Sequence, residues 1–338
     1  MDTRQEEGTG TASAAVREGP VAVVFPGQGS QKPGMGRAWQ QTPSWELVVS
    51  IGDWTGFDME ALLLTADADE LRRTDRAQLA VFALSAVAHA EAARLGVLGN
   101  VVGYAGHSLG EFTALYASGA VGLRECALLV AERGDAMLEA ARSEPGTMCA
   151  VMGEGVAGGG GERLAAACRE AGHPVWVANL NSPQQVVLSG TQAAIAAAEE
   201  LAAASGLKSA RLEVSGAFHS PLMLPAARRL RGALDETRFK PPSTPVVAGF
   251  DGRVHPEAED WPELMAGQLT GAVRWEDCMR TLVGGLGALA VLELGPGRTL
   301  SGLAARIDQS LPALSVRTPA PLAALAQGAR PNSYATTQ

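Results

Sequence analysis

Residues 100 to 112 read NVVGYAGHSLGEF, which predicts a strand, a sharp turn and the start of a helix. Ser108 follows the apolar run and stands between two glycines in the pattern G-x-S-x-G. A strand-to-helix elbow strains the backbone of its serine, and small neighbours keep the turn free of clashes. The Leu109 amide, at the helix start, would then be placed to stabilise an oxyanion. A glycine-rich loop without chemistry remains the alternative at this point.

Strands and helices alternate on both sides of this elbow. An apolar strand is predicted at 21–25, and amphipathic helices are predicted at 77–95 and 123–141. Further along, helices are expected at 221–236 and 261–282 and strands at 244–250 and 288–294. This alternation predicts an α/β fold with a mostly parallel, covered sheet, of the α/β-hydrolase-like kind.

The pattern changes between residues 146 and 214. Successive strand, helix, strand, strand, helix and strand are predicted at 147–153, 161–172, 174–180, 184–190, 191–206 and 207–214. This β-α-β-β-α-β order is the ferredoxin-like pattern, so we expect a small ferredoxin-like domain at 146–214, inserted into the large one. The large domain then covers 20–145 and 215–317. Residues 1–19 are expected to be a disordered tail, and 318–338 a second tail.

Composition narrows the class of protein. The chain has 338 residues, of which 46% are hydrophobic, and a net charge of −9, which argues against a nucleic-acid binder. The four cysteines, Cys126, Cys149, Cys168 and Cys278, have no metal-ligand spacing and are expected to be buried thiols in a reducing compartment. No apolar run approaches the ~20 residues that cross a bilayer, and the N-terminus lacks a signal-peptide core. We therefore expect a cytoplasmic protein.

A nucleophilic serine needs a base, and the chain has five histidines. His89 falls in an apolar helix, and His173 and His255 are interpreted as solvated loop residues. His107 is adjacent to Ser108, but neighbouring side chains diverge on such a turn, so packing beneath the elbow is its expected role. His219, in the turn after the small domain, sits where clefts form between domains. We therefore expect His219 to be the base.

The usual third member of a triad is absent. No Asp or Glu between Ser108 and His219 marks itself as an orienting carboxylate, and the residue order does not match an α/β-hydrolase triad. A backbone carbonyl or a side-chain amide can fix the histidine tautomer instead.

Seven segments together resemble one family. They are FPGQGSQ (25–31), AGHSLGEF (105–112), ERG (132–134), NSPQQVVLSG (181–190), GAFHSPLM (216–223), QL and VRW (within 268–275) and LGPGRTL (294–300). In this order, from about residue 20 to 317, they are similar to the malonyl-CoA:acyl carrier protein transacylases, the discrete acyltransferases of fatty-acid and polyketide synthesis. One G-x-S-x-G alone would not carry this resemblance.

The resemblance implies a set of roles. Ser108 would be the nucleophile and His219 its base, with the backbone N–H groups of Gln28 and Leu109 as oxyanion hole. Gln268 resembles the residue whose backbone carbonyl orients the histidine, which would account for the missing acid.

It also implies how the substrate is chosen. Arg133 stands where the family places the arginine that binds the malonyl carboxylate, although an arginine on an amphipathic helix is usually a surface residue. Phe218 resembles the residue that restricts room for an α-branch. Asn181 resembles a pocket residue, and its alternative role is to form a turn before Ser-Pro.

The expected partners follow from the same resemblance. They are malonyl-CoA, a CoA thioester that serves as substrate, and an acyl carrier protein. No metal, cofactor, nucleic acid or membrane is expected, and the protein is expected to be a monomer. The alternatives are a transacylase or proofreading hydrolase for another acyl group, an esterase or peptidase, and a non-catalytic docking module. The sequence leaves open whether the pathway makes fatty acids or a polyketide.

Overall fold

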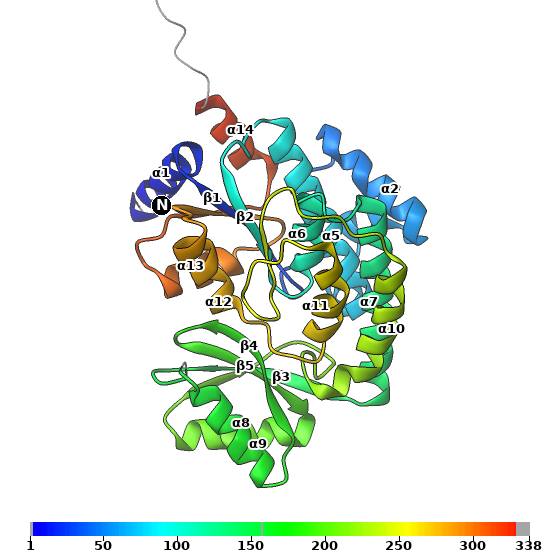
Figure 1. The fold of residues 1–338 in the computed structure, drawn as a ribbon, viewed down its shortest axis with the longest axis vertical. Coiled ribbons are helices and arrows are strands. Elements are labelled where there is room, and N and C mark those ends of the chain that lie inside the picture. The colour runs from blue at the N-terminus through cyan, green and yellow to red at the C-terminus, as the bar shows by residue number, and fades with distance from the viewer. Residues whose placement is uncertain (1–2, 157, 329–338) are drawn as a thin grey trace, which may run out of the picture.

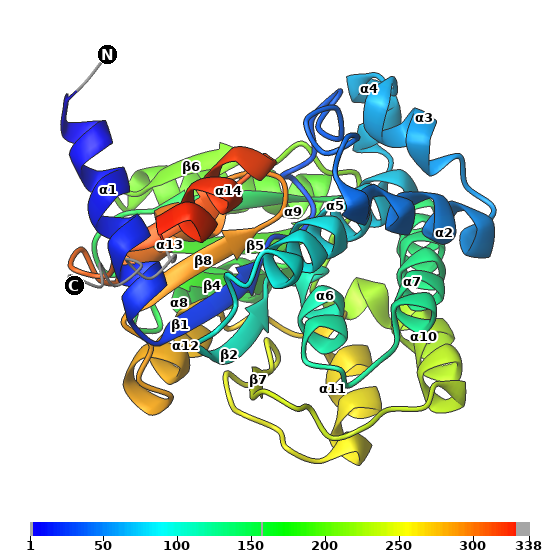
Figure 2. The ribbon, with the colours of Figure 1, turned by 90° about the horizontal axis from the view of Figure 1, so that it is seen from above.

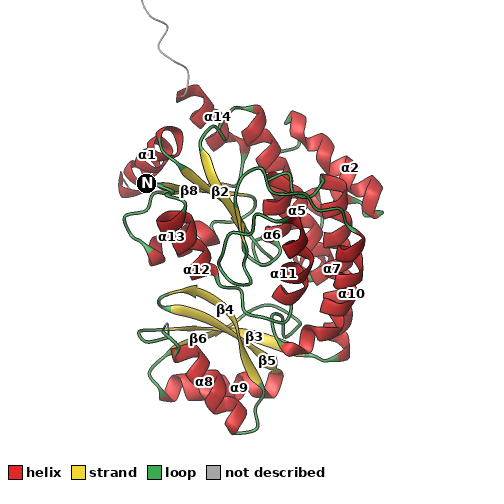
Figure 3. Ribbon diagram, viewed as in Figure 1, coloured by secondary structure: helices red, strands yellow, loops and turns green. Residues whose placement is uncertain are grey.

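The chain forms a large body around a parallel sheet and a smaller body around an antiparallel sheet (Figure 1). The computed structural model describes residues 3–156 and 158–328. Figure 3 shows most helices gathered around the parallel sheet, with the second sheet set apart from them and carrying helices of its own.

The larger sheet places the elbow beside another loop. Its strands are β1 (Val21–Phe25), β2 (Val101–Gly106), β7 (Val246–Val247), β8 (Ala290–Leu294) and β9 (Ala313–Val316). They lie in the order β7-β2-β1-β8-β9, and all neighbours are parallel. Because Phe25 pairs with Gly106, the segments that follow β1 and β2 leave the same edge of the sheet side by side. This edge therefore holds both FPGQGSQ and the elbow.

Both faces of this sheet are buried, as the uninterrupted apolar run VAVVF predicts. Along β1, Val21, Val23 and Phe25 belong to one apolar cluster, whereas Ala22 and Val24 belong to another. Figure 2 shows α5 (Thr74–Arg94) and α6 (Gly110–Ala117) together on one side of β1 and β2. The second cluster contains residues of α12 (Trp275–Arg280) and α13 (Thr299–Ile307).

The helices around this sheet include three short ones that the sequence did not reveal, α2 to α4. The bounds are α1 (Thr3–Glu18), α2 (Glu46–Thr55), α3 (Met59–Leu64), α4 (Ala68–Arg72), α5 (Thr74–Arg94), α6 (Gly110–Ala117), α7 (Leu123–Ser143), α10 (Leu224–Glu236), α11 (Trp261–Gln268), α12 (Trp275–Arg280), α13 (Thr299–Ile307) and α14 (Pro319–Gly328). Single turns are η1 (Pro43–Trp45), η2 (Pro221–Met223), η3 (Ala258–Asp260) and the π-type η4 (Thr281–Gly285). Among the described residues, no helix has the length and hydropathy to cross a membrane.

The smaller sheet follows the expected β-α-β-β-α-β order. Its elements are β3 (Gly146–Met152), α8 (Gly160–Glu170), β4 (Val175–Ser182), β5 (Gln185–Thr191), α9 (Gln192–Ala204) and β6 (Lys208–Arg211). The strands are antiparallel, in the order β4-β5-β3-β6. One face packs on α8 and α9 in a cluster of its own. Met148, Ala150 and Val187, on the other face, join the core of the larger body.

Several predicted elements differ in extent, and the strand expected at 244–250 covers only Val246–Val247. The helix expected at 261–282 is wrong as a single element, because it is interrupted between α11 and α12. There Val273 pairs with the smaller sheet: its amide donates to Ala178 O, and its carbonyl accepts from Leu180 N, each over 2.9 Å. The strand expected at 207–214 covers only Lys208–Arg211. The interruption thus hydrogen-bonds a loop of the larger body to β4 of the smaller sheet.

The expectation of tails at both ends is corrected. Residues 3–18 form α1, which buries Ala12 and Val16 and packs on β8 and β9. Residues 319–328 form α14, which buries Leu322 and Leu325. Apolar residues four or three positions apart share one helix face, and here the larger sheet and its helices cover that face. Residues 1–2 and 329–338 of the expected tails lie outside the described residues.

Gly110, two residues after Ser108, allows a prediction about the stability of the fold. A Cβ on Gly110 would lie 2.1 Å from the carbonyl oxygen of Phe25, so Gly110→Ala must push α6 away from β1. We expect the free energy of unfolding to fall by about 3 kcal/mol or more, measured by urea denaturation.

The matched control is Gly302→Ala, inside α13, where no heavy atom lies within 4 Å of a new Cβ. This variant should unfold at the parent's urea concentration or be up to about 1 kcal/mol more stable. Equal midpoints for Gly110→Ala and the parent would contradict the steric account.

Candidate active site

Ser108 lies on a strained turn between β2 and α6. Its φ is 53°, and only it and His219 combine a side chain with positive φ among the described residues. A Cβ on Gly106 would lie 1.9 Å from the carbonyl carbon of Gly110, so neither glycine of the pattern can be replaced without moving backbone. The structure thus confirms the strained elbow, and the strain turns the Ser108 side chain away from the sheet.

His219 contacts Ser108 across 111 positions of sequence. Its Nε2 lies 2.7 Å from Ser108 Oγ, and its Nδ1 lies 2.8 Å from the backbone carbonyl of Gln268. A carbonyl oxygen only accepts hydrogen bonds, so Nδ1 carries the proton and Nε2 is free to accept one from the serine. Burial, and next the positive charge of Arg133, lower the pKa of His219 to about 3, so the imidazole is neutral at pH 7.

Arg133 is a buried residue and not a surface one. It is 1% exposed, and its guanidinium contacts three side chains: Nη1 donates to Gln78 Oε1 over 2.6 Å, and Nη2 to Ser108 Oγ over 3.0 Å and to Gln268 Oε1 over 3.4 Å. Its Nε is buried without an acceptor in the described structure. Burial lowers its pKa to about 10, which keeps it charged at neutral pH. A buried cation with unfilled donors is suited to a carboxylate ligand.

These groups open onto one cavity of about 640 Å³ between the two sheets. Its lining includes Gln28, Ser108, Arg133, Asn181, Phe218 and His219. Met148, Ala150 and Val187 of the smaller sheet form an apolar wall. The structure therefore confirms the expected cleft between the two bodies and brings these six residues to it, whereas Gln268 and Leu109 do not line it.

Two backbone amides beside Ser108 have no acceptor. Within the described chain, neither the Gln28 nor the Leu109 N–H donates to another backbone or side-chain group. Gln28 follows β1 and Leu109 follows β2, which are paired in the sheet, so both amides stand at the same edge. Unpaired N–H groups next to a nucleophile are the arrangement that an oxyanion hole requires.

A family model for the acyl transferase domain matches residues 22–301. The malonyl CoA-acyl carrier protein transacylase of Bacillus subtilis is 36% identical over 302 residues, which are 88% of this chain and 94% of that protein. The chain belongs to the malonyl CoA-acyl carrier protein transacylase family. This confirms the resemblance that the seven segments carry.

Solved structures with names of this family match the whole fold. The acyl-carrier-protein S-malonyltransferase of Burkholderia pseudomallei has a TM-score of 0.84 and 35% identity, covering 91% of this chain and 99% of that one. The malonyl CoA-acyl carrier protein transacylase of Coxiella burnetii has a TM-score of 0.85 and 32% identity, covering 91% and 97%. Both the sheets and the helices thus follow a malonyl transacylase arrangement.

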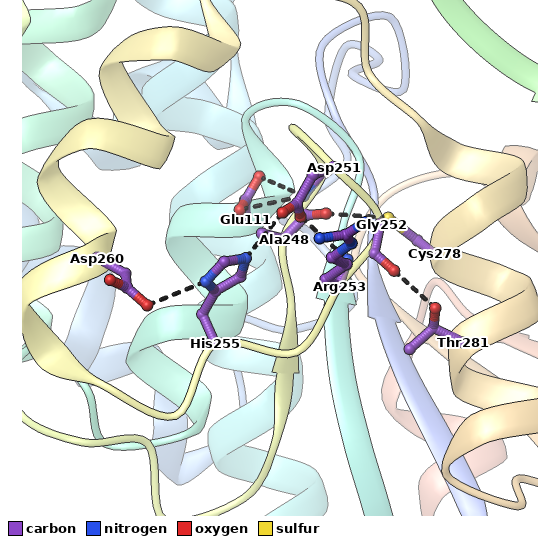
Figure 4. Close-up of polar contacts among 10 residues, drawn as sticks. Glu111, Ala248, Asp251, Gly252, Arg253, His255, Asp260, Cys278 and Thr281 are labelled. Atoms are coloured by element: carbon purple, nitrogen blue, oxygen red, sulfur yellow. Dashed lines mark hydrogen bonds and ion pairs between the residues drawn. The ribbon is translucent and has the colours of Figure 1, made fainter.

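The structure shows the contacts of two further histidines, His107 and His255. The His107 Nε2 lies 2.9 Å from Asn181 Oδ1, and its ring lies 5.5 Å from that of Trp275, so it lines the cavity and does not only pack beneath the elbow. His255 lies in a loop, as expected, but its side chain is only 19% exposed. It is held between Asp251 and Asp260 (Figure 4).

Sequence reasoning missed two residues of the site. Gln78 accepts from Arg133, and Glu111 accepts from the Gln268 side chain. The signal for Gln78 was an amide inside the apolar run AQLAVFALSAVAHA. The signal for Glu111 was a carboxylate in the first turn of α6, where the structure buries it. In residues 3–156 and 158–328, no group of three His, Cys, Asp or Glu side chains is arranged to hold a metal ion.

The depressed pKa of His219 makes stability depend on pH. The unfolded histidine titrates near 6.5 and the folded one near 3, so the unfolded chain binds more protons between these values. The contribution of His219 to stability is complete above pH 6.5 and is lost as the pH falls toward 3. We expect this loss to approach about 1.4 kcal/mol per pH unit.

The measurement is urea unfolding of the parent and His219→Asn at pH 7, 6 and 5. The asparagine does not titrate, so below pH 6.5 the free energy of unfolding of the parent should fall relative to that of His219→Asn. His89 and His107 titrate alike in both proteins and cancel. Parallel pH curves would show that His219 is not held neutral.

Proposed function

We propose that this protein transfers a malonyl group from malonyl-CoA to the phosphopantetheine thiol of an acyl carrier protein, through an ester on Ser108. The observation that carries the proposal is the buried Arg133 guanidinium, whose Nη2 lies 3.0 Å from Ser108 Oγ, in the cavity that holds His219. A cation at this position can bind the free carboxylate of the malonyl group while the thioester carbonyl of the same group faces Ser108. The names of the relatives agree with this substrate.

The first half-reaction loads the serine. Ser108 Oγ gives its proton to His219 Nε2 and attacks the thioester carbonyl. The resulting oxyanion accepts hydrogen bonds from the Gln28 and Leu109 amides, each contributing roughly 2.7–4 kcal/mol in the transition state. The carbon–sulfur bond then breaks, and the CoA sulfur leaves with the proton from His219.

The second half-reaction reverses these steps. The carrier-protein thiol gives its proton to His219 Nε2, and its sulfur attacks the malonyl ester. The Ser108 oxygen leaves with that proton. Gln268 keeps the imidazole oriented through its backbone carbonyl, 2.8 Å from Nδ1. Side chains and backbone of this chain perform every step, and CoA enters only as part of the substrate.

Three residues would select the acyl group. Arg133 binds the free carboxylate, and an acetyl group would leave it without that ligand. Phe218 lines the cavity next to His219 and would restrict an α-methyl branch, a discrimination of only about 1–3 kcal/mol. Asn181 faces the cavity from β4, where its amide nitrogen donates to Gln185 and its oxygen is paired with His107.

The proposal divides the chain into two domains that enclose the site. We assign an α/β-hydrolase-like domain to residues 20–145 and 215–317 and a ferredoxin-like domain to residues 146–214. Their facing surfaces would exclude water from the malonyl ester, whose hydrolysis would waste the substrate. The same proposal takes the protein to be a cytoplasmic monomer that meets its carrier protein by collision.

Intact mass spectrometry tests the loading step. After incubation with malonyl-CoA, the protein should gain one malonyl group, and Ser108→Ala should gain none. Incubation with acetyl-CoA should leave most of the protein unmodified. Malonate on Ser108→Ala, or equal loading of acetate, would contradict the proposal. Rapid release of free malonate without carrier protein would instead indicate a hydrolase.

The choice of acyl group is tested by Arg133→Ala. Without the guanidinium, the ratio of malonyl to acetyl transfer should fall by about 10²–10³-fold, the loss expected for a buried charge pair. The control is Arg229→Ala, an exposed arginine paired with Glu132 and Glu139, which should keep the parental ratio. An unchanged ratio in Arg133→Ala would remove Arg133 from substrate binding.

A further inference from the structure

Glu111 is a buried carboxylate that the proposed reaction does not use. It lies three residues after Ser108 and is 1% exposed. The Gly249 amide lies 3.2 Å from each of its oxygens, and Gln268 Nε2 donates to Oε2. Figure 4 shows the carboxylate facing the loop that carries Ala248 and Asp251. A Cβ on Gly249 would stand 3.0 Å from Oε2, so the loop approaches this closely because residue 249 is a glycine.

Its partner Gln268 contacts His219, Arg133 and the Ser108 backbone as well. The Gln268 backbone carbonyl accepts from His219, and its side-chain Oε1 accepts from Arg133. Its Nε2 donates both to Glu111 and, over 3.3 Å, to the Ser108 carbonyl. The residue is fully buried at the end of α11. One side chain therefore connects Glu111 with the base and with the guanidinium.

The orientation of the Gln268 side-chain amide depends on which groups contact its oxygen and its nitrogen. An amide presents donors on one side and an acceptor on the other. Arg133 only donates, so Oε1 must face it, and this requires an acceptor for Nε2 at the opposite end. Glu111 supplies that acceptor. With the carboxylate gone, the amide could rotate and set its own N–H groups against those of Arg133.

We propose that Glu111 is a positioning residue for acyl transfer, which acts through Gln268 to hold His219 and Arg133 in place. The inference rests on the proposed function. All three donor contacts of the carboxylate come from N–H groups, which favours an ionised acceptor. The charged or titratable groups near it are Arg133 from α7, Asp251 from the loop after β7 and Cys278 from α12. Burial raises the pKa of Glu111 to about 8, so the ionised form that these contacts favour predominates only above that pH.

The test is a double-mutant cycle on malonyl transfer to carrier protein, measured above pH 8, where Glu111 is ionised. Glu111→Gln keeps the size of the side chain but replaces one acceptor by a donor, and Gln268→Leu removes the same contact from the other side. Rates are expressed per serine that malonyl-CoA can load, which removes any loss of folded protein. Each variant should lower kcat about 10- to 100-fold, the effect of a broken charge-assisted hydrogen bond. The double variant should lose little more than the worse single one.

The matched control is Glu91→Gln, a second buried glutamate, which bonds to Ser44 and Arg94 and touches no residue of the site. Its kcat should equal that of the parent. An unchanged kcat in Glu111→Gln, or losses that multiply in the double variant, would overturn the inference. If Glu111→Gln does not fold, an unchanged kcat in Gln268→Leu would overturn it equally. If the parent itself takes no malonate, the proposed function fails, and this inference fails with it.

Discussion

The site depends on a close approach of backbones at residues 106–110. Two glycines let α6 start against β1, where a single methyl group would lie about 2 Å from backbone atoms. This contact fixes the φ of Ser108 at 53° and points its hydroxyl into the cavity. The pairing of β1 with β2 then sets Gln28 beside the elbow. The positions of Ser108 and of the Gln28 and Leu109 amides thus follow from one steric constraint in the core of the larger sheet.

A buried cation is the second organising feature. Arg133 cannot be hydrated, so Gln78, Gln268 and Ser108 accept its N–H groups and compensate part of the desolvation. Its charge also helps to keep His219 neutral, which lets that histidine accept a proton at physiological pH. Under the proposed function, the same guanidinium would bind the acyl carboxylate and keep the His219 imidazole neutral. Under the proposed function, a malonyl carboxylate would complete the coordination that the protein leaves open at Arg133.

Much of the arrangement could be predicted from the sequence. The apolar runs VAVVF and NVVGYAG predicted the central strands because both sheet faces are buried, and the order of elements predicted the smaller sheet. Burial of Arg133 could not be predicted from its helix alone and came from the resemblance. Glu111 and Gln78 were not identified from the sequence because a single carboxylate or amide on a helix is usually a surface residue. Its burial becomes evident only once its neighbours in the fold are known. The tails were misjudged because α1 is stabilised by packing on β8 and β9 and not by its own composition.

Under the proposed function, Ser108 carries the acyl group while Arg133 binds its free carboxylate. A crystal structure of the protein after soaking with malonyl-CoA tests this most directly. The account predicts continuous density from Ser108 Oγ to a malonyl group, with the carboxylate within hydrogen-bond distance of the Arg133 guanidinium. Density on another residue, or a carboxylate turned away from Arg133 toward solvent, would contradict it.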